Sequence, residues 1–216
     1  MDCIIPCVNY DDFLDITLQF NRRHFDTIMV VSTDDDKDTR KCCYKHKVLC
    51  LCTDSWFSDG ARFNKGKALN AALALFREAN WICSMDADIV LPDSFGYQTN
   101  VLDPANLYSA ERRMCDTERG FDTFLATRDF ERFKPYYDSQ MMMSDNYLLG
   151  YLQIWCQGVQ RVRFPEVYDN AAMYDLAFAN NWEIENRLMI PGMAVLHLGD
   201  PKRNWDGRIS DRWGSK

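Results

Sequence analysis

The first hundred residues alternate short apolar runs with helical patterns, and this alternation constrains the fold more than any other feature of the sequence. The apolar runs predict buried strands at residues 3–8, 27–32, 48–53 and 81–85. Apolar side chains at helical spacing predict helices at 11–21 and 65–79. Because strands that alternate with helices form βαβ units, we expect an α/β fold with a mostly parallel sheet flanked by helices.

The second half of the sequence is less regular. Its apolar runs predict strands at 106–110, 147–155 and 194–198, and its spacing predicts a helix at 170–181. The polar and aromatic stretch 115–144 indicates a helix followed by a mobile loop, of the kind that often covers a ligand. No linker or repeat interrupts the 216 residues, so we expect a single domain over 1–216.

The composition excludes several classes of protein. Apolar residues make up 47% of the chain, which is enough for a sizeable core and excludes intrinsic disorder. The net charge of −7 argues against duplex nucleic acid as the main partner, because phosphates bind clustered Lys and Arg. The longest apolar run, 71–76, is too short to cross a bilayer, and the N-terminus lacks a secretory signal. We expect a cytoplasmic protein with no membrane span.

Nine cysteines are an odd number for a disulfide framework in a chain of this length. We expect structural thiols in a reducing compartment. A zinc site is the alternative, because one stretch contains Cys42, Cys43, Cys50, Cys52 and His46. The spacing of these cysteines lacks the two-residue gap typical of zinc knuckles, which favours the thiol interpretation.

Two carboxylates, Asp86 and Asp88, directly follow the predicted strand 81–85. Ligands of open parallel sheets bind beyond the carboxyl ends of the strands, so these side chains lie where a ligand would bind. Two such carboxylates can share a divalent cation, which neutralises diphosphate oxygens. The alternative is an acidic turn that caps a following helix at Asp93 or Ser94.

Three further polar segments are expected at the same edge of the sheet. The helix in 63–73 begins with Lys65 and Gly66, and it would offer backbone N–H groups and positive charge to a phosphate. The other two segments, 5–10 and 32–36, follow the first and second predicted strands. Each also has a purely structural interpretation, as a solvated turn or as the basic first turn of a helix.

These elements resemble, in order and spacing, the GT-A fold glycosyltransferases, and most closely the large family 2 type of inverting enzymes. The resemblance covers residues 3–95, and the residues that carry it are Pro6, Asn9, Tyr10, Thr33, Asp34, Asp35, Lys65, Gly66, Lys67, Ala68, Leu69, Asn70, Asp86, Ala87 and Asp88. It implies that the segments after the first two strands hold a nucleotide base. It also implies that Lys65, Gly66 and Asn70 lie near the ribose and diphosphate, and that the Asp86-Ala87-Asp88 segment binds ribose and a metal ion.

The second half of the chain matches the same family less fully. The family carries an acidic pair that opens a helix; here Asp169 occupies the first position and Asn170 replaces the second acid. The resemblance implies that Asp169 is the general base for the acceptor hydroxyl, with Asp175 as the second candidate; the alternative for Asp169 is a helix cap. Metal-dependent members often supply a late histidine ligand, which implies that His197 joins the two carboxylates around the metal.

The resemblance as a whole implies a metal-dependent inverting glycosyltransferase that uses Mn²⁺ or Mg²⁺. It would move a sugar from a nucleotide diphosphate donor, a UDP-sugar by the family template, to a hydroxyl of a glycan or other acceptor. Residues 1–95 would form the nucleotide-binding half and 96–216 the acceptor-binding half. The chain also resembles the small glycosyltransferases of large algal viruses. Two alternatives stay open: a sugar-nucleotide nucleotidyltransferase, and a catalytically inactive sugar- or nucleotide-binding domain.

Other side chains of the second half are weaker candidates for the same site. Aromatic rings that could stack on an acceptor sugar are Tyr136, Tyr137, Tyr147, Tyr151, Trp155, Trp182 and Trp205. Cations that could face the diphosphate are Arg112, Arg113, Lys202 and Arg203. Core packing for the rings and surface solvation for the cations are the more common roles.

Overall fold

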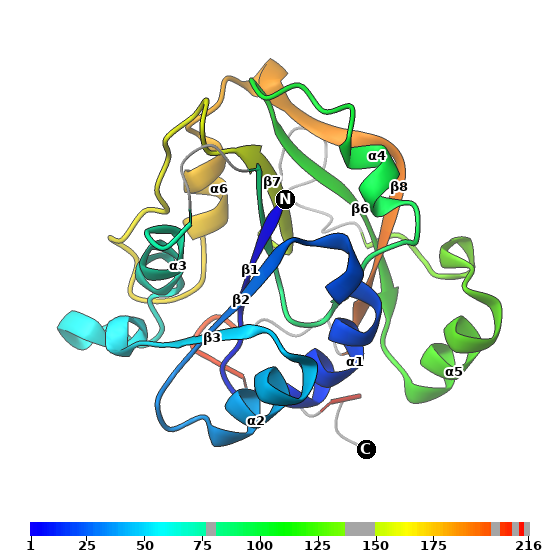
Figure 1. The fold of residues 1–216 in the computed structure, drawn as a ribbon, viewed down its shortest axis with the longest axis horizontal. Helices are drawn as coiled ribbons and strands as arrows, with labels where there is room; N and C mark the ends of the chain where they lie inside the picture. Colours follow the sequence, from blue (N-terminus) through cyan, green and yellow to red (C-terminus); the bar gives the residue numbers. More distant parts are fainter. Residues whose placement is uncertain (77–80, 137–149, 200–203, 209–211, 214–216) are drawn as a thin grey trace.

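One sheet runs through the molecule, in a computed structural model that describes residues 1–76, 81–136, 150–199, 204–208 and 212–213. Its eight strands lie in the order β3-β2-β1-β4-β7-β6-β8-β5 (Figure 1). Their bounds are β1 (Asp2–Pro6), β2 (Thr27–Ser32), β3 (Leu49–Cys52), β4 (Trp81–Met85), β5 (Ile89–Val90), β6 (Leu107–Cys115), β7 (Leu152–Cys156) and β8 (Arg187–Leu198).

The two halves of the sheet differ in strand direction. The neighbours β3, β2, β1 and β4 are all parallel. Strand β7 is antiparallel to both β4 and β6, β6 is parallel to β8, and β5 is antiparallel to β8. The predicted α/β fold with a mostly parallel sheet is therefore confirmed, with the antiparallel pairings confined to the second half of the order.

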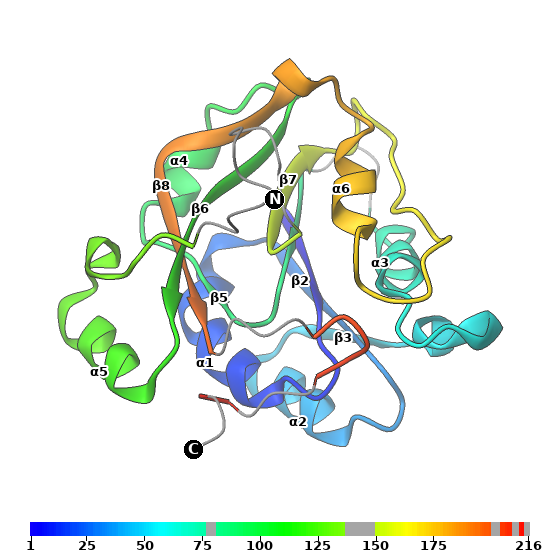
Figure 2. The same cartoon turned by 180° about the vertical axis from the view of Figure 1, so that it is seen from behind.

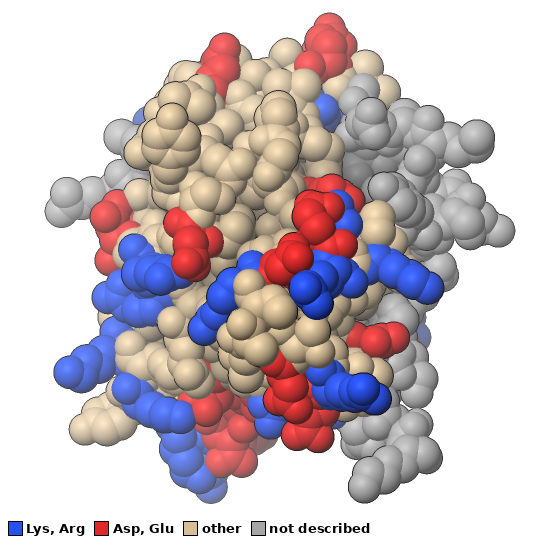
Figure 3. Space-filling view, turned by 90° about the vertical axis from the view of Figure 1, so that its right-hand side faces the viewer, with Lys and Arg blue, Asp and Glu red and all other residues tan. Residues whose placement is uncertain are grey.

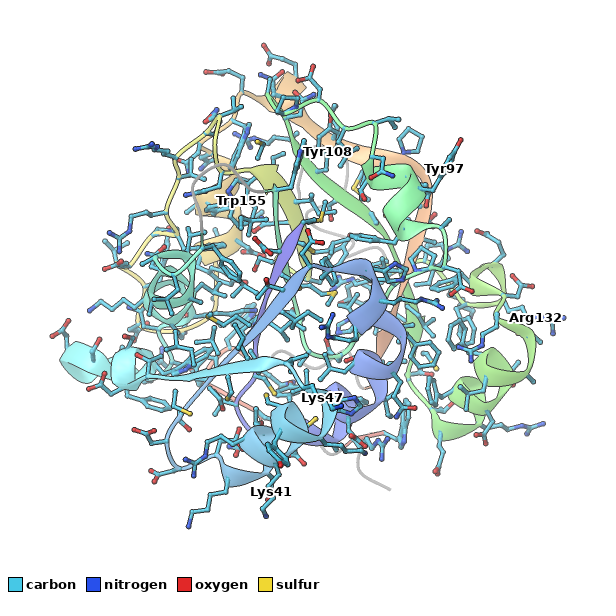
Figure 4. All side chains as sticks on the ribbon, viewed as in Figure 1. Lys41, Lys47, Tyr97, Tyr108, Arg132 and Trp155 are labelled. Carbon is cyan, nitrogen blue, oxygen red and sulfur yellow. The ribbon has the colours of Figure 1, made fainter. Side chains whose placement is uncertain are left out.

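Helices cover both faces of the sheet (Figures 1 and 2). Their bounds are α1 (Asp11–Asn21), α2 (Lys37–His46), α3 (Lys65–Leu73), α4 (Phe95–Thr99), α5 (Glu118–Thr127) and α6 (Tyr174–Ala179). One buried cluster joins α1, α2 and α4 to the sheet, and a second joins α3 and α6 to its other face. In the second cluster Trp155 of β7 packs its ring on Phe164 and Phe178 (Figure 4). Both faces are therefore buried, as a parallel sheet requires.

The elements of the first half begin and end close to the predicted positions. Helix α1 and strands β2 and β4 have the predicted bounds. Helix α3 is shorter than predicted and ends at Leu73 rather than at residue 79. The N–H groups of Leu75 and Phe76 bond three residues back, to Ala72 and Leu73, at 2.9 and 3.2 Å, so the α-helix tightens into a final turn. Residues 77–79 of the predicted helix lie outside the described residues.

The elements of the second half depart further from prediction. Strands β6 and β8 extend well beyond 106–110 and 194–198 because they pair with each other along most of their length. Helix α6 begins at Tyr174 rather than at 170, because Met173 has a left-handed backbone with φ of 66°. Helix α5 occupies part of the predicted 115–144 segment; the loop after residue 136, like 147–149 of the predicted strand, lies outside the described residues.

Three other expectations concern the membrane, the thiols and the surface charge. Among the helices that the structure describes, none has the length and apolar character needed to cross a membrane. All nine cysteines are described and are free thiols. On the face shown in Figure 3, basic and acidic side chains interleave in the lower half, while the upper part is mostly uncharged.

Candidate active site

A cavity of about 270 Å³ opens where β1 and β4 end. The predicted residues that line it are Pro6, Tyr10, Lys65, Asp86, Ala87, Asp88, Asp175 and His197. The predicted residues outside its lining are Asn9, Asp34, Asp35, Gly66, Asn70 and Asp169. Residues almost 200 positions apart in sequence thus meet at the expected edge of the sheet.

Asp88 and His197 lie side by side in the lining of this cavity. The antiparallel pairing of β5 with β8 sets Ile89 opposite His197, and the Asp88 carbonyl accepts the Leu198 N–H at 2.9 Å. This register brings Asp88 Oδ2 to 3.1 Å from His197 Nε2, with side chains only 13% and 15% exposed. Burial would raise the pKa of Asp88, but the neighbouring His197 and Lys65 hold it below its ordinary value, so the carboxylate stays ionised.

The Asp88–His197 pair fits a divalent cation. Asp88 Oδ1 and His197 Nδ1 are buried and have no hydrogen-bond partner within the described chain. An ionised carboxylate with an unsatisfied buried oxygen is costly unless something positive binds it. Carboxylate oxygen and imidazole nitrogen are suitable ligands for Mn²⁺, and Mg²⁺ accepts the carboxylate. The facing atoms, Asp88 Oδ2 and His197 Nε2, lie 3.1 Å apart, which is close to the separation of adjacent ligands of one octahedral ion, roughly 3 Å.

Asp86 is held by Lys65 instead. Lys65 Nζ lies 2.5 Å from Asp86 Oδ1 and 5.0 Å from the centre of the Tyr174 ring. Burial would lower the pKa of Lys65, but the Asp86 charge outweighs it and raises that pKa, so the pair is ionic. The ligand atoms of Asp86, Asp88 and His197 do not gather within 4.8 Å of one another. Of the three predicted ligands, Asp88 and His197 lie side by side, whereas Asp86 is bound by Lys65.

The turn after β1 is held by Asp36, which belongs to the predicted polar segment 32–36 but is not among the predicted site residues. The Asp36 carboxylate is buried, and it accepts hydrogen bonds from the Asn9 N–H at 2.7 Å and from Ser32 and Thr39. Asn9 has φ of 59°, so this bond fixes a left-handed turn that carries Tyr10 to the cavity. Asp34 and Asp35 are exposed. The signal available in the sequence was an aspartate at the start of α2 with a threonine three residues later, which is a helix-cap pattern.

Gly66 and Asn70 of α3 contact another part of the chain, the 162–166 segment, and do not line the cavity. A Cβ at Gly66 would lie 2.1 Å from the Pro165 carbonyl oxygen, so only glycine allows this approach. The Asn70 side chain accepts the Phe164 N–H at 2.9 Å and donates to the Phe164 carbonyl at 2.8 Å. The two residues thereby fix α3, and with it Lys65, against the 162–166 segment.

The two candidate bases lie in different surroundings. Asp169 is 65% exposed and is ion-paired with Arg62 at 3.2 Å. It does not open a helix, since α6 starts only at Tyr174. Asp175 lines the cavity and accepts the N–H groups of Gly150 and Leu176 at 2.6 and 2.9 Å. Burial raises its pKa above the ordinary value despite these two hydrogen bonds.

Arg112 adds positive charge to the wall opposite β1. Its guanidinium lies between two rings, 4.2 Å from Tyr136 and 4.7 Å from Tyr151. Its buried Nε has no hydrogen-bond partner in the described residues, and no ion pair forms there. Arg112 lies two residues before Met114, which is paired with His197 across β6 and β8. By contrast, Arg113 is bound by Glu111 and Glu131.

The described C-terminal segment 204–208 completes the cavity. Asn204, Trp205 and Arg208 line it, and Arg208 donates to the Asn9 carbonyl at 2.7 Å beside the turn after β1 (Figure 2). Of the aromatic candidates, Tyr136, Tyr151 and Trp205 line the cavity, whereas Trp155 and Trp182 are buried in the core. Tyr137, Tyr147, Lys202 and Arg203 lie outside the described residues.

Comparisons with known proteins identify the fold. No protein-family model matches the sequence, and no curated protein matches it. Glucosyl-3-phosphoglycerate synthase from Mycobacterium tuberculosis in complex with UDP is similar, with a TM-score of 0.60 at 12% identity over 94% of this chain and 72% of that chain. The same enzyme with Mn²⁺, UDP and glucosyl-3-phosphoglycerate has a TM-score of 0.58 at 12% identity, over 93% and 72%.

A third similar structure aligns with a smaller share of both chains. Mannosyl-3-phosphoglycerate synthase from Rubrobacter xylanophilus is 21% identical over 52% of this chain and 40% of that chain, with a TM-score of 0.42. At such identities structural likeness establishes the fold alone. The expected GT-A fold is confirmed by the glucosyl-3-phosphoglycerate synthase matches.

Proposed function

We propose, from a GT-A fold with an acidic pair at its ligand-binding edge, that this chain transfers a sugar from a nucleotide diphosphate donor to an acceptor hydroxyl, with inversion. The observation that carries the proposal is the Asp88–His197 pair in the cavity lining, whose buried carboxylate oxygen Oδ1 has no hydrogen-bond partner among the described residues. A purely structural ion pair would satisfy its buried atoms within the protein. One similar solved structure holds Mn²⁺ and UDP and another holds UDP, which supports a UDP-sugar donor and a divalent cation.

Asp88 and His197 would hold Mn²⁺ or Mg²⁺. When bound, such an ion neutralises charge on the departing diphosphate. Asp88 is suited to this because it is ionised and rigidly placed by the β5–β8 pairing. We assign Asp86 to the ribose and diphosphate side, where Lys65 already holds it.

The nucleoside would bind on the β1 side of the cavity. Pro6, Val8 and Tyr10 line that side, and the lining also includes Trp56 and Phe63, whose tilted rings have centroids 4.7 Å apart. Apolar and aromatic walls with a few polar groups are typical of small-molecule sites. Asn9, Asp34 and Asp35 stay predicted base contacts; in the described structure their region positions Tyr10 rather than lining the cavity.

Asp175 is our candidate general base, in preference to Asp169. A base must reach the proton it removes and works best when its pKa approaches the working pH. Asp175 lines the cavity, and burial raises its pKa, which is the direction that suits a base. Each of its oxygens accepts one backbone N–H, which orients the carboxylate and leaves a further lone pair on each oxygen for a substrate hydroxyl.

Arg112 would stabilise negative charge on the donor diphosphate. Among the described cations of the lining, Lys65 and Arg208 have carboxylate partners, whereas Arg112 contacts two tyrosine rings and has no carboxylate partner among the described residues. A charged group that binds developing charge lowers the barrier most when it is already in place. The rings on either side hold Arg112 in such a position.

The test combines binding with turnover. Thermal unfolding with UDP, with and without Mn²⁺, should show a UDP-dependent rise in the melting temperature that requires the metal. A panel of nucleotide sugars should then show metal-dependent release of UDP from one of them. UDP binding without release of UDP from any donor would favour the inactive binding domain. Binding of nucleoside triphosphates with pyrophosphate release would favour the nucleotidyltransferase.

A further inference from the structure

A second cluster of metal-ligating side chains lies away from the cavity, between α1 and α2. One ligand atom each of Asp15, Cys42 and His46 lies within 4.8 Å of the other two. No other group of three such residues is found in the part of the chain that the structure describes. These three side chains come from two adjacent helices that pack on the same face of the sheet (Figure 1).

The local geometry explains why the three side chains meet. Cys42 and His46 are four residues apart on α2, so they share one helix face. Asp15 on α1 approaches that face: His46 Nε2 lies 2.7 Å from Asp15 Oδ1, and Cys42 Sγ lies 4.0 Å from the same oxygen. The cysteine is buried and the histidine side chain is 13% exposed, whereas the aspartate side chain is 37% exposed. A solvent hollow lined by Asp15 and Cys42 gives an ion access.

The charges around the cluster favour a cation. Asp11, Asp12 and Asp38 line the same hollow as Asp15, facing the basic side chains Lys41, Lys45 and Arg212. Burial, together with the Asp12 and Asp36 charges, raises the pKa of Asp11. The Lys45 ammonium already binds both oxygens of Asp15, at 2.6 and 2.8 Å. The Asp15 carboxylate is thus a cation-binding group in the structure as it stands.

We propose that Asp15, Cys42 and His46 form a zinc site separate from the cavity, with water as the fourth ligand. Binding would displace the Lys45 ammonium from Asp15 and release the Cys42 thiol proton to solvent, because the thiolate is the ligand. The ion would then link α1 to α2 by three protein bonds. Lys41 extends from α2 into solvent and takes no part (Figure 4).

The ligand types distinguish this site from the cavity. A thiolate and an imidazole favour zinc over Mg²⁺ and Mn²⁺, whereas the Asp88–His197 pair carries no sulfur. The other nearby thiols, Cys43, Cys50 and Cys52, do not gather with a third ligand within 4.8 Å. Within the cysteine-rich stretch 42–52, therefore, only Cys42 lies beside both His46 and an aspartate.

The experiment is a zinc titration of the full chain, carried out in an Asp88→Asn, His197→Gln background so that the cavity pair cannot contribute. One zinc per chain should bind, and Co²⁺ in its place should show the thiolate charge-transfer absorption of a cysteine ligand. Cys42→Ser and His46→Gln should each weaken zinc binding at least tenfold and remove that absorption or shift it. Cys50→Ser, which changes a half-buried thiol outside the cluster, is the matched control and should bind as the background does.

Two results would overturn the proposal. One is stoichiometric zinc binding that neither Cys42→Ser nor His46→Gln weakens. The other is equal loss in Cys50→Ser, which would assign the metal to the remaining thiols. Thermal unfolding of each metal-free variant establishes that it is folded; if Cys42→Ser does not fold, His46→Gln and Asp15→Asn carry the test, because both positions are partly exposed.

Discussion

The parallel and mixed halves of the sheet supply the cavity in different ways. Strands β1 and β4 both end at the cavity, so the residues that follow them, such as Tyr10 and Asp86, line it directly. In the mixed half, β7 runs the other way and Tyr151 lines the cavity just before it begins. Strand β6 contributes Arg112 and Met114 from within the strand, on one face, because alternate side chains point the same way.

The candidate metal pair takes one residue from each half of the sheet. Asp88 follows β4 in the parallel half, and His197 belongs to β8 in the mixed half. Only the pairing of β5 with β8 brings the two together. Because this contact joins the two halves, substitutions at Asp88 or His197 should affect function most, and substitutions within one half should affect it less.

Asp88→Asn should therefore have the largest effect. It removes the charge of the proposed ligand while keeping its shape, and metal-assisted charge stabilisation is worth several kcal/mol, so turnover should fall about a thousandfold or more. The rise in melting temperature caused by UDP with Mn²⁺ should disappear. Asp122→Asn, an exposed aspartate on α5, is the control and should behave as the wild type. Metal-dependent UDP binding by Asp88→Asn would refute the assigned ligand.

Asp175→Asn should come next, with turnover reduced by about 10²–10⁴ and UDP binding retained, since general-base catalysis contributes on that order. Asp169→Asn should keep near-normal turnover, because Asp169 is exposed and bound to Arg62. Steady-state kinetics of both variants, together with UDP-induced thermal shifts, measure the difference. The opposite pattern would return the base to the position that the family resemblance implied.

Arg112→Met should lower kcat/KM by roughly 10- to 100-fold, because a hydrogen bond to a charged group is worth about 1.5–3 kcal/mol. Methionine can still pack between Tyr136 and Tyr151, so the wall should keep its shape. Arg119→Met, an exposed arginine of α5, controls for the loss of one positive charge from the chain. Unchanged kcat/KM in Arg112→Met would show that the mixed half contributes no charge to the reaction.

Gly66→Ala should mainly affect stability. The added Cβ would lie 2.1 Å from the Pro165 carbonyl, and overpacking of this kind costs about 1–3 kcal/mol. Gly96→Ala on α4 is the matched control, since nothing lies within 4 Å of its added Cβ and alanine favours a helix. Urea unfolding of both variants compares the two costs. Equal stabilities would mean that α3 and the 162–166 segment separate without cost.

The contrast between the two halves of the sheet also explains which residues of the site could be predicted from the sequence. Residues after β1 and β4 could be placed because a parallel strand ends where ligands bind, whatever its partners. The role of Asp36 was missed because the sequence shows only its local position as a helix cap. Its hydrogen bond from the Asn9 N–H joins residues 27 positions apart in the chain. The family resemblance placed Asp169 at the opening of a helix; the left-handed Met173, which delays the start of α6 to Tyr174, has no signature in its own side chain. Arg112 lines the cavity because β6 continues to Cys115 and pairs with β8, whereas the sequence predicted a strand that ends at residue 110.

The sequence by itself determined the α/β class, the bounds of most first-half elements and the edge of the sheet that holds Asp86 and Asp88. These depend on periodicity and on residues that follow one another in the chain, so local preference decides them. The family resemblance implied His197 beside the two carboxylates, but only the tertiary structure decided the contacts themselves: His197 beside Asp88, Lys65 on Asp86, and Asp175 in the wall. Strand register and helix packing set these contacts, and both arise from the burial of apolar surface by the whole chain rather than from any one segment.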